Sequence, residues 1–224
     1  MFAISKHGAQ YERIKSAVRD ALPLPYTWRV KGVKAVSRLH QRFFEDFVFI
    51  HINKCGGTSL ERALGIPFLD HDMAVERRAF LGEKEWGRRF KLSLVRHPYD
   101  RVISHYLYER RDEEVTEAQL HEAFPAWLDR WEQANKGQPS RWDAPMRDWI
   151  ADANGDIIVD KVYKLEEIDA AVEDISRLTG RTMVLHHIKA KTQKADRKSF
   201  LTPEVKERIF RTHRVDFEAF GYRP

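Results

Sequence analysis

The feature that most constrains this sequence is a strand, a glycine-containing or polar loop and a helix start, which follow one another twice. The first copy, FVFIHINKCGGTSL, begins at Phe47 and places an apolar run before a lysine, a cysteine, two glycines and two hydroxyl side chains. The pattern predicts a buried strand at 47–52 and a short helix at 58–64. The second copy joins a buried strand, KLSLV at 91–95, to a helix that begins at Pro98. Strands that alternate with helices predict an α/β fold, with a parallel sheet covered by helices on both faces.

Other elements are expected where apolar periodicity or a helix cap predicts them. They are helices at 72–86, at 117–150 around a loop at 135–140, and at 166–180, one or two strands within 156–165, and a last helix that begins at Pro203 after the cap Thr202. The segment 117–150 contains four tryptophans, at 127, 131, 142 and 149. These side chains could be part of the core or could form a surface that stacks on a sugar.

Length and charge limit the classes of partner. A chain of 224 residues suits one domain, expected at 46–224 behind a basic, helical N-terminal extension at 1–45. The 39 Lys and Arg exceed the 34 Asp and Glu by only five, and both signs run through the whole chain, so no nucleic-acid partner is expected. Between 181 and 200, however, six basic residues accompany one acid. This stretch could close over a phosphorylated ligand, or it could be a solvated loop.

Cysteine content and hydropathy bear on location. The only cysteine, Cys55, excludes an internal disulfide, and a reducing cytoplasm is therefore the expected location. No apolar run approaches the roughly 20 residues that cross a bilayer, so no transmembrane segment is expected.

The loop after the first strand has the composition of an anion site. Backbone N–H groups at a helix start, together with the positive end of the helix dipole, bind phosphate, and Lys54 would add a full charge. The alternative is a tight strand-to-helix turn whose lysine is solvated. A Walker A loop would place its lysine after the glycines, and no G-x-G-x-x-G element is present, so ordinary ATPases and Rossmann dehydrogenases are disfavoured.

Both copies of the pattern resemble one family. Strand-x-x-K-x-G-G-T-S is similar to the 5'-phosphosulfate loop of sulfotransferases that use 3'-phosphoadenosine 5'-phosphosulfate (PAPS). The segment LSLVRHPYDRVISHYLY resembles that family's 3'-phosphate motif, in which an Arg at a strand end and a Ser eight residues later hold the 3'-phosphate. Arg96 and Ser104 have this spacing. With further similarities up to the closing FGYRP, the resemblance covers about 47–224 and is closest to the bacterial and Golgi carbohydrate-type branch, which is of the family 2 type.

The resemblance implies a P-loop-like parallel β-sheet with α-helices on both faces, PAPS as co-substrate, 3',5'-bisphosphoadenosine (PAP) as product, and no metal. It makes Lys54 a catalytic residue that stabilises charge on the leaving nucleotide, and it assigns the 3'-phosphate to Arg96 and Ser104. The loop residues implied in nucleotide binding are Lys54, Cys55, Gly56, Gly57, Thr58 and Ser59. Two positions depart from the family pattern: Asn53 stands where relatives usually carry proline, and Cys55, expected to be a small packed residue, stands where Thr or Ala is common.

The acceptor hydroxyl also needs a base, and histidine can serve near neutral pH. The candidate is His71, because relatives in this branch often show His-x-x-Ala at this place; Asp70, Asp72 or Glu76 could take the role instead. Lys189 and Lys191, with His186 and His187, occupy the region where relatives close a loop over the nucleotide. The expected acceptor is a carbohydrate, a glycolipid or another hydroxyl compound. A nucleotide kinase and a non-catalytic nucleotide-binding protein remain alternatives.

Overall fold

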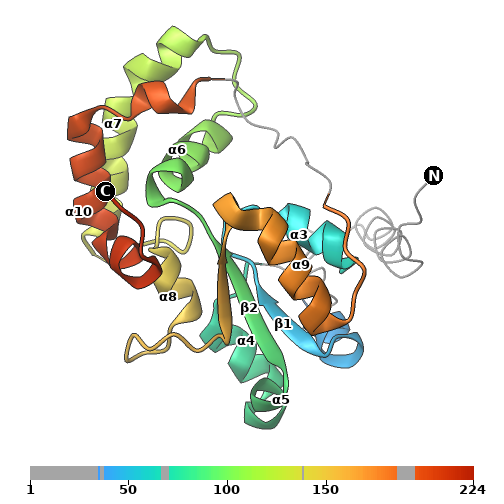
Figure 1. The fold of residues 1–224 in the computed structure, drawn as a ribbon. Helices are drawn as coiled ribbons and strands as arrows, with labels where there is room; N and C mark the ends of the chain where they lie inside the picture. The colour runs from blue at the N-terminus through green and yellow to red at the C-terminus, as the bar shows by residue number, and fades with distance from the viewer. Residues whose placement is uncertain (1–34, 36–37, 67–70, 138, 186–194) are drawn as a thin grey trace, which may run out of the picture.

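The computed structural model describes residues 35, 38–66, 71–137, 139–185 and 195–224. In this part of the chain, three parallel strands form one sheet in the order β1 (Phe47–Ile50), β2 (Phe90–Val95) and β3 (Lys161–Lys164) (Figure 1). Phe47 pairs with Phe90, and Leu92 pairs with Lys161. All four side chains of β1 are buried, as expected for a strand that is covered on both faces. The predicted parallel α/β arrangement is confirmed, although β1 ends two residues earlier than expected.

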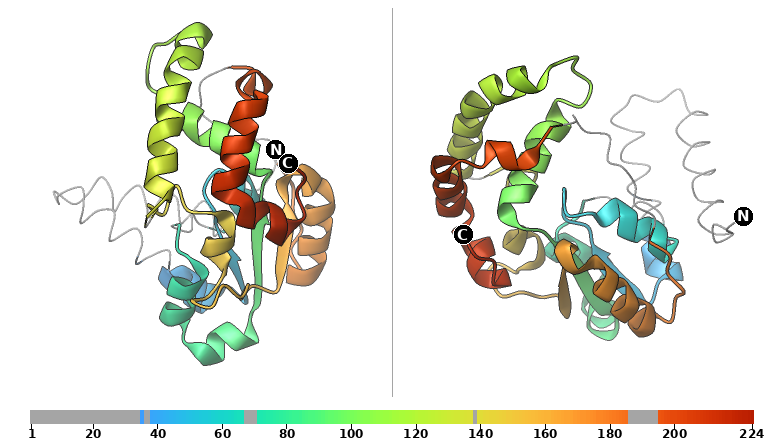
Figure 2. Two further views of the ribbon diagram at one scale, coloured as in Figure 1. Left: turned by 90° about the vertical axis from the view of Figure 1, so that its left-hand side faces the viewer. Right: turned by 45° about the horizontal axis from the view of Figure 1, so that its top comes forward.

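Helices lie on both sides of this sheet. Figure 1 and the left-hand view of Figure 2 show α9 (Ile168–Thr179) on one side and α4 (Ala74–Leu81) on the other. The helix α3 (Gly57–Leu64) follows the glycine loop, and a 3-10 turn, η1 (Leu165–Glu167), leads into α9. Gly180 ends α9 in the left-handed conformation, as the sequence predicts.

The single helix predicted at 72–86 is wrong, because the chain forms two helices there. The first, α4, ends before Gly82, and α5 runs over Glu83–Arg88. Gly82 has φ 84° and ψ 156°, a combination that is open to glycine but strained for residues with a Cβ. The apolar periodicity continues across this position, so it could not reveal the break.

A second group of helices packs beyond the carboxyl end of β2 (Figure 1). It contains α6 (Pro98–Glu109), α7 (Glu117–Asn135), the 3-10 turn η2 (Arg197–Phe200) and α10 (Pro203–Phe220). Their buried side chains form a hydrophobic cluster separate from the one around the sheet. Thr202 caps α10 by accepting a hydrogen bond from the amide of Val205 at 3.3 Å, as predicted.

The tryptophans divide between these clusters and the surface. Trp127 and Trp131 lie in the helical cluster, and Trp149 lies in the cluster around the sheet. Trp142 is 46% exposed. Of the two roles that the sequence left open, three tryptophans therefore have the core role, and the fourth lies partly at the surface.

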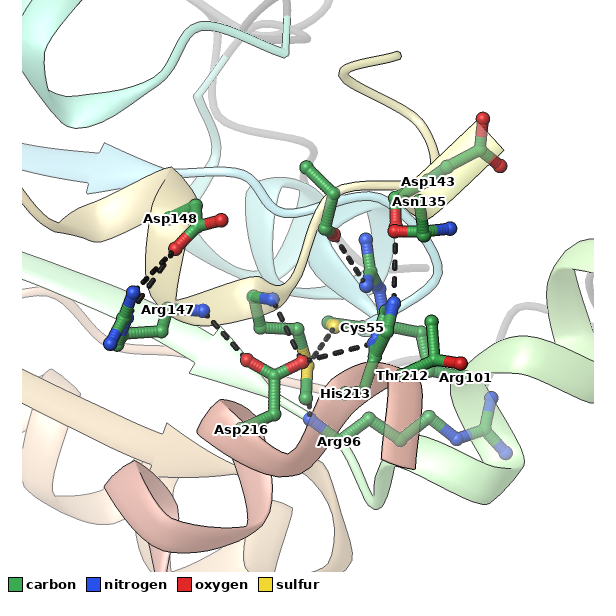
Figure 3. Close-up of polar contacts among 12 residues, drawn as sticks. Cys55, Arg96, Arg101, Asn135, Asp143, Arg147, Asp148, Thr212, His213 and Asp216 are labelled. Atoms are coloured by element: carbon green, nitrogen blue, oxygen red, sulfur yellow. Dashed lines mark hydrogen bonds and ion pairs between the residues drawn. The ribbon is translucent and has the colours of Figure 1, made fainter. Parts of the chain in front are cut away.

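The helix α8 (Met146–Ile150) connects the two clusters. The carboxylate of Asp216, on α10, accepts hydrogen bonds from the amides of Met146 (2.9 Å) and Arg147 (2.8 Å) at the start of α8 (Figure 3). Asp216 is fully buried. It therefore links the last helix of the chain to a helix whose apolar side chains pack on the sheet.

Most of the predicted extension at 1–45 lies outside the described residues. Where the structure describes it, at 38–44, the chain is helical and bound to the remainder of the protein. Arg38 donates to both oxygens of Asp72 at 2.8 Å, and Arg89 donates to the carbonyl of Gln41 at 2.6 Å. The division at residue 45 stays a prediction. Among the described helices, none combines the length and the apolar character needed to cross a membrane.

Candidate active site

The glycine loop turns sharply between β1 and α3. Lys54 has φ 63° and Gly56 has φ 81°, and Lys54 is alone among the described non-glycine residues in having a positive φ. Such a backbone is costly for a residue with a Cβ and is frequent at functional sites. The carbonyl of Gly56 accepts hydrogen bonds from the amides of Ser59 (3.0 Å) and Leu60 (3.3 Å). The first N–H groups of α3 thus lie directly after the turn, at the positive end of the helix dipole.

Packing within the protein requires both glycines of the loop. A Cβ on Gly57 would lie 2.1 Å from Cδ2 of His51, and a Cβ on Gly56 would lie 2.6 Å from Cδ1 of Leu165. Glycine at a helix start also lets an anion approach the backbone without a Cβ in the way. The structure adds a second reason, because neighbouring side chains already occupy the space that a Cβ would need.

Lys54 lies among other cations. Its Nζ is 3.8 Å from the centroid of the Tyr108 ring, on α6. Burial, together with the positive charges of Arg197, Arg96 and Arg111, lowers the pKa of Lys54 to about 8. Burial and the charge of Arg96 also lower the pKa of Arg197. Cations gathered in this way repel one another unless an anion joins them, so this group is a candidate anion site.

Arg96 directly follows β2, at the same edge of the sheet as the glycine loop. Figure 3 shows its side chain extending away from the contacts around Asp216, and no dashed contact involves its guanidinium. Among the described residues, Lys54, Arg96 and Arg197 form no ion pair with a carboxylate. Ser104 is buried in the second turn of α6, one turn before Tyr108 and on the same face of the helix. Its contact with a phosphate stays a prediction.

Asn53, the departure from the family pattern, anchors the glycine loop. Its Oδ1 accepts a hydrogen bond from Arg101 at 2.6 Å, and its Nδ2 donates to the carbonyl of Trp142 at 3.0 Å. Arg101 also donates to the carbonyl of Ala144 at 2.9 Å. A proline could not make the side-chain contacts, so in this chain hydrogen bonds take over the restraint that a proline ring would give.

Cys55 and Arg96 both contact the sulfur atom of Met146. The Sγ of Cys55 and the backbone amide of Arg96 each lie 3.4 Å from the Sδ of Met146 (Figure 3). Cys55 is fully buried, and burial raises the pKa of its thiol to about 12. It therefore stays a thiol and is a packed residue, not a nucleophile. Met146 joins the glycine loop to the loop after β2.

His71 lies beside the glycine loop. Its Nδ1 is 3.0 Å from the carbonyl oxygen of His51, three residues before Lys54. A ring nitrogen can only donate to a carbonyl, so Nδ1 carries the proton and the neutral ring has its lone pair on Nε2. The imidazole also packs against His51, with ring centroids 4.4 Å apart, and against Trp142, at 4.8 Å. This tautomer is the one that a base acting through Nε2 requires.

The other candidate bases are engaged elsewhere or lie outside the described residues. Asp72 is buried and pairs with Arg38 and Arg77. Glu76 accepts from the amide of Met73 at 2.7 Å and pairs with Arg141. Asp70 lies outside the described part of the chain. The geometry therefore favours His71 over Asp72 and Glu76.

The remaining predicted residues are only partly placed. Thr58 is exposed and Ser59 is half-buried in the first turn of α3, where their hydroxyls can reach solvent. Lys189 and Lys191, with His186 and His187, lie outside the described residues. Within the described ranges, no three His, Cys, Asp or Glu side chains gather as metal ligands would.

Two residues of this site, Arg197 and Met146, were not predicted from the sequence, and Trp142 was named only as one of four tryptophans with a core or a sugar-stacking role. Arg197 stood in the basic stretch at 181–200 but was not selected, because charge alone does not say which side chain of a stretch reaches a site. Met146 and Trp142 meet the loops through contacts that span about 50 to 90 residues of sequence. No local pattern records such contacts.

Comparisons with known proteins agree with this geometry. A family model described as "Sulfotransferase family" matches residues 41–223, which include both loops and all the described candidate residues. Searches of curated proteins and of solved structures found no match.

Proposed function

Because the chain belongs to the sulfotransferase family and is therefore a sulfuryl transferase, we propose that it transfers the sulfuryl group of PAPS to a hydroxyl of a carbohydrate or glycolipid. The observation that carries the proposal is the group of cations Lys54, Arg96 and Arg197 at the carboxyl edge of the sheet, which lack carboxylate partners among the described residues. PAPS is an adenosine with anionic groups at both its 3' and 5' positions. Two cationic loops at neighbouring strand ends suit such a ligand better than one isolated loop would.

The glycine loop is the proposed P-loop-like site for the 5'-phosphosulfate. The amides of Gly57 and Thr58 and the hydroxyls of Thr58 and Ser59 would bind the 5'-phosphate at the start of α3. On the 3' side, Arg96 would form a bidentate contact with the phosphate, assisted by Ser104. The charges of Arg197 and Arg96 both act on Lys54, and the charge of Arg96 acts on Arg197, so a phosphorylated ligand among these three side chains would relieve their mutual repulsion. Lys189 and Lys191 remain candidates to cover the nucleotide.

In the transfer step, the bond between sulfur and the bridging oxygen of the 5'-phosphate breaks, and a bond forms between sulfur and the acceptor oxygen. The electron pair of the broken bond stays on the leaving phosphate, where the ammonium of Lys54 stabilises it. His71 takes the acceptor's proton on Nε2, while its Nδ1 keeps the hydrogen bond to the carbonyl of His51. Positioning and charge stabilisation account for most of the rate in transfers of this kind.

Differential scanning fluorimetry with PAP, 5'-AMP and ATP tests the donor part of the proposal. A ligand present at a hundredfold excess over its Kd stabilises the folded state by about 2.7 kcal/mol. PAP should raise the unfolding temperature well above the values with 5'-AMP and ATP. An equal effect of 5'-AMP and PAP would contradict the proposal, and stabilisation by ATP that requires Mg²⁺ would favour a nucleotide kinase.

Turnover separates an enzyme from a binding protein. With PAPS and an acceptor mixture, the unmodified protein should release PAP, and Lys54→Ala should abolish this release while PAP still stabilises the fold. The matched control Lys84→Ala removes an exposed lysine in α5, before β2, and should leave PAP release unchanged. Binding of PAP without any release by the unmodified protein would favour a non-catalytic nucleotide-binding protein.

A further inference from the structure

Trp142 differs from the other tryptophans of its segment. Its side chain is 46% exposed, whereas Trp127, Trp131 and Trp149 are at most 5% exposed. A scattered apolar side chain on a surface is ordinary by itself. Trp142 needs an explanation because of what holds it and what it contacts.

The turn that carries Trp142 is tied to separate parts of the protein. The carbonyl of Trp142 accepts from Asn53 of the glycine loop (3.0 Å), and the carbonyl of Ala144 accepts from Arg101 of α6 (2.9 Å). On the other side, Arg141 donates to the carbonyl of His71 at 2.6 Å and also pairs with Glu76. The backbone that carries the indole is therefore anchored on both sides, although much of the indole faces solvent.

The exposed indole borders on the proposed transfer site. Its ring lies 4.8 Å from the imidazole of His71, at an interplanar angle of 70°. Its backbone is one hydrogen bond away from Asn53, the residue before Lys54. An acceptor whose hydroxyl reaches His71 would thus bring its neighbouring atoms close to this indole.

We propose that Trp142 is an acceptor-binding residue whose indole stacks on a pyranose ring and so directs one hydroxyl of that ring to His71. This inference rests on the proposed function, since it assumes that a sulfuryl group moves from PAPS, bound at Lys54, to an acceptor hydroxyl at His71. A pyranose presents an apolar C–H face and a polar rim, which match a rigid aromatic surface beside polar groups. An acyclic polyol has no such face. The pyranose could belong to a free oligosaccharide or to the headgroup of a glycolipid.

The test measures transfer of labelled sulfate from PAPS to acceptors of four kinds. They are methyl pyranosides with disaccharides, glycolipids in detergent micelles, the acyclic polyol sorbitol, and the phenol p-nitrophenol. The variants are Trp142→Ala, Trp142→Phe, which keeps an aromatic face, and the control Phe43→Ala, which removes another exposed aromatic side chain. The shift in unfolding temperature caused by PAP is measured for each variant.

The unmodified protein should sulfate pyranosides or glycolipids and leave sorbitol unmodified. Trp142→Ala should raise the KM of the accepted pyranoside by roughly tenfold, with the PAP shift unchanged. The KM of Trp142→Phe should stay near that of the unmodified protein, and the KM of Phe43→Ala should equal it. If the free sugars are sulfated, the pyranose belongs to an oligosaccharide. If only the glycolipid in micelles is sulfated, the pyranose belongs to a glycolipid headgroup.

Three results would overturn the inference. The first is an unchanged KM in a folded Trp142→Ala protein, and the second is a preference of the unmodified protein for sorbitol or p-nitrophenol. In both cases a normal PAP shift leaves the proposed donor site standing. The third is the absence of any PAP shift in the unmodified protein, which removes the proposed function and this inference with it.

Discussion

At the scale of single residues, the most informative side chain is Lys54. It combines a left-handed backbone, a contact with the Tyr108 ring and a pKa of about 8, well below the ordinary value of 10.5. A lysine whose pKa is lowered by folding costs stability while it is charged in both states, and this cost falls as pH rises from about 8 towards 10.5. An anion bound beside Lys54 raises its pKa again, so anion binding and protonation support each other.

Affinity for PAP should therefore depend on pH in a defined direction. Below about pH 8 the ammonium is present before binding, and the Kd should be constant once the phosphates of PAP are fully ionised. As pH rises through about 8, binding must take up a proton, and the Kd should increase. Isothermal titration calorimetry in buffers of different ionisation enthalpy measures both the Kd and the proton uptake.

Lys54→Arg supplies the control for this pH dependence, because a guanidinium stays charged across the range. Its Kd should not vary between about pH 7 and 9.5. A pH dependence that persists in Lys54→Arg would assign the titration to another group.

Arg96 should determine the preference for a 3'-phosphate. A bidentate ionic contact is worth about 2 kcal/mol, so Arg96→Ala should weaken PAP binding roughly tenfold to a hundredfold and leave 5'-AMP binding nearly unchanged. The matched control Arg88→Ala removes an exposed arginine at the end of α5 and should change neither Kd. Equal losses for PAP and 5'-AMP in Arg96→Ala would place Arg96 outside the 3'-phosphate site.

At the scale of elements, the start of α3 depends on close packing with β1 and η1. Gly57, the first residue of α3, leaves room for the ring of His51. The Nδ1 of that ring lies 2.8 Å from the carboxylate of Glu61, which is also in α3. The ring of His51 thus lies between the first turn and the second turn of α3. The position of the helix start, and with it the direction of the amides of the proposed anion site, follows from this packing.

Gly57→Ala should therefore destabilise the protein, since its Cβ would lie 2.1 Å from the imidazole of His51. Overpacking of this kind costs about 1–3 kcal/mol, which urea unfolding measures. Gly87→Ala is the control, because a Cβ at Gly87, inside α5, meets no atom within 4 Å. Because alanine favours a helix more than glycine does, Gly87→Ala should leave the free energy of unfolding unchanged or raise it by up to about 1 kcal/mol. Equal stability of the two variants would refute the packing explanation.

The sequence is informative about elements that local patterns define. The cap Thr202, the terminator Gly180 and the strand before the glycine loop could all be predicted, because each depends on neighbouring residues. The break at Gly82 could not be predicted, because a glycine within a periodic segment is compatible with one helix or two. Arg197, Met146 and Trp142 belong to the site through tertiary contacts, which periodicity and motif spacing do not encode.

At the scale of the whole molecule, two hydrophobic clusters must hold one site together. The glycine loop and Arg96 adjoin the cluster around the sheet, whereas Tyr108 and Arg197 come from α6 and η2 of the helical group. The buried Asp216 connects the groups by binding the first amides of α8 from α10. Loss of the Asp216 carboxylate should therefore destabilise both groups of elements.

Asp216→Ala should lower the free energy of unfolding by about 2–4 kcal/mol, because two buried amides and His213 lose a charged partner. Asp148→Ala removes a partly exposed carboxylate that pairs with Arg147 on the same helix and should cost less than about 1 kcal/mol. Urea unfolding followed by tryptophan fluorescence and by circular dichroism measures both values. Similar costs for the two aspartates would show that α10 does not hold α8 through Asp216.

The thioether of Met146 has a consequence for ligand length. It contacts Cys55 on one side and the amide of Arg96 on the other, so one sulfur atom lies between the loops that follow the two strands. A shorter or stiffer side chain there would alter that gap and mismatch any molecule that must bridge it. We therefore expect selection among nucleotides of different reach to depend in part on a buried atom that no nucleotide would contact.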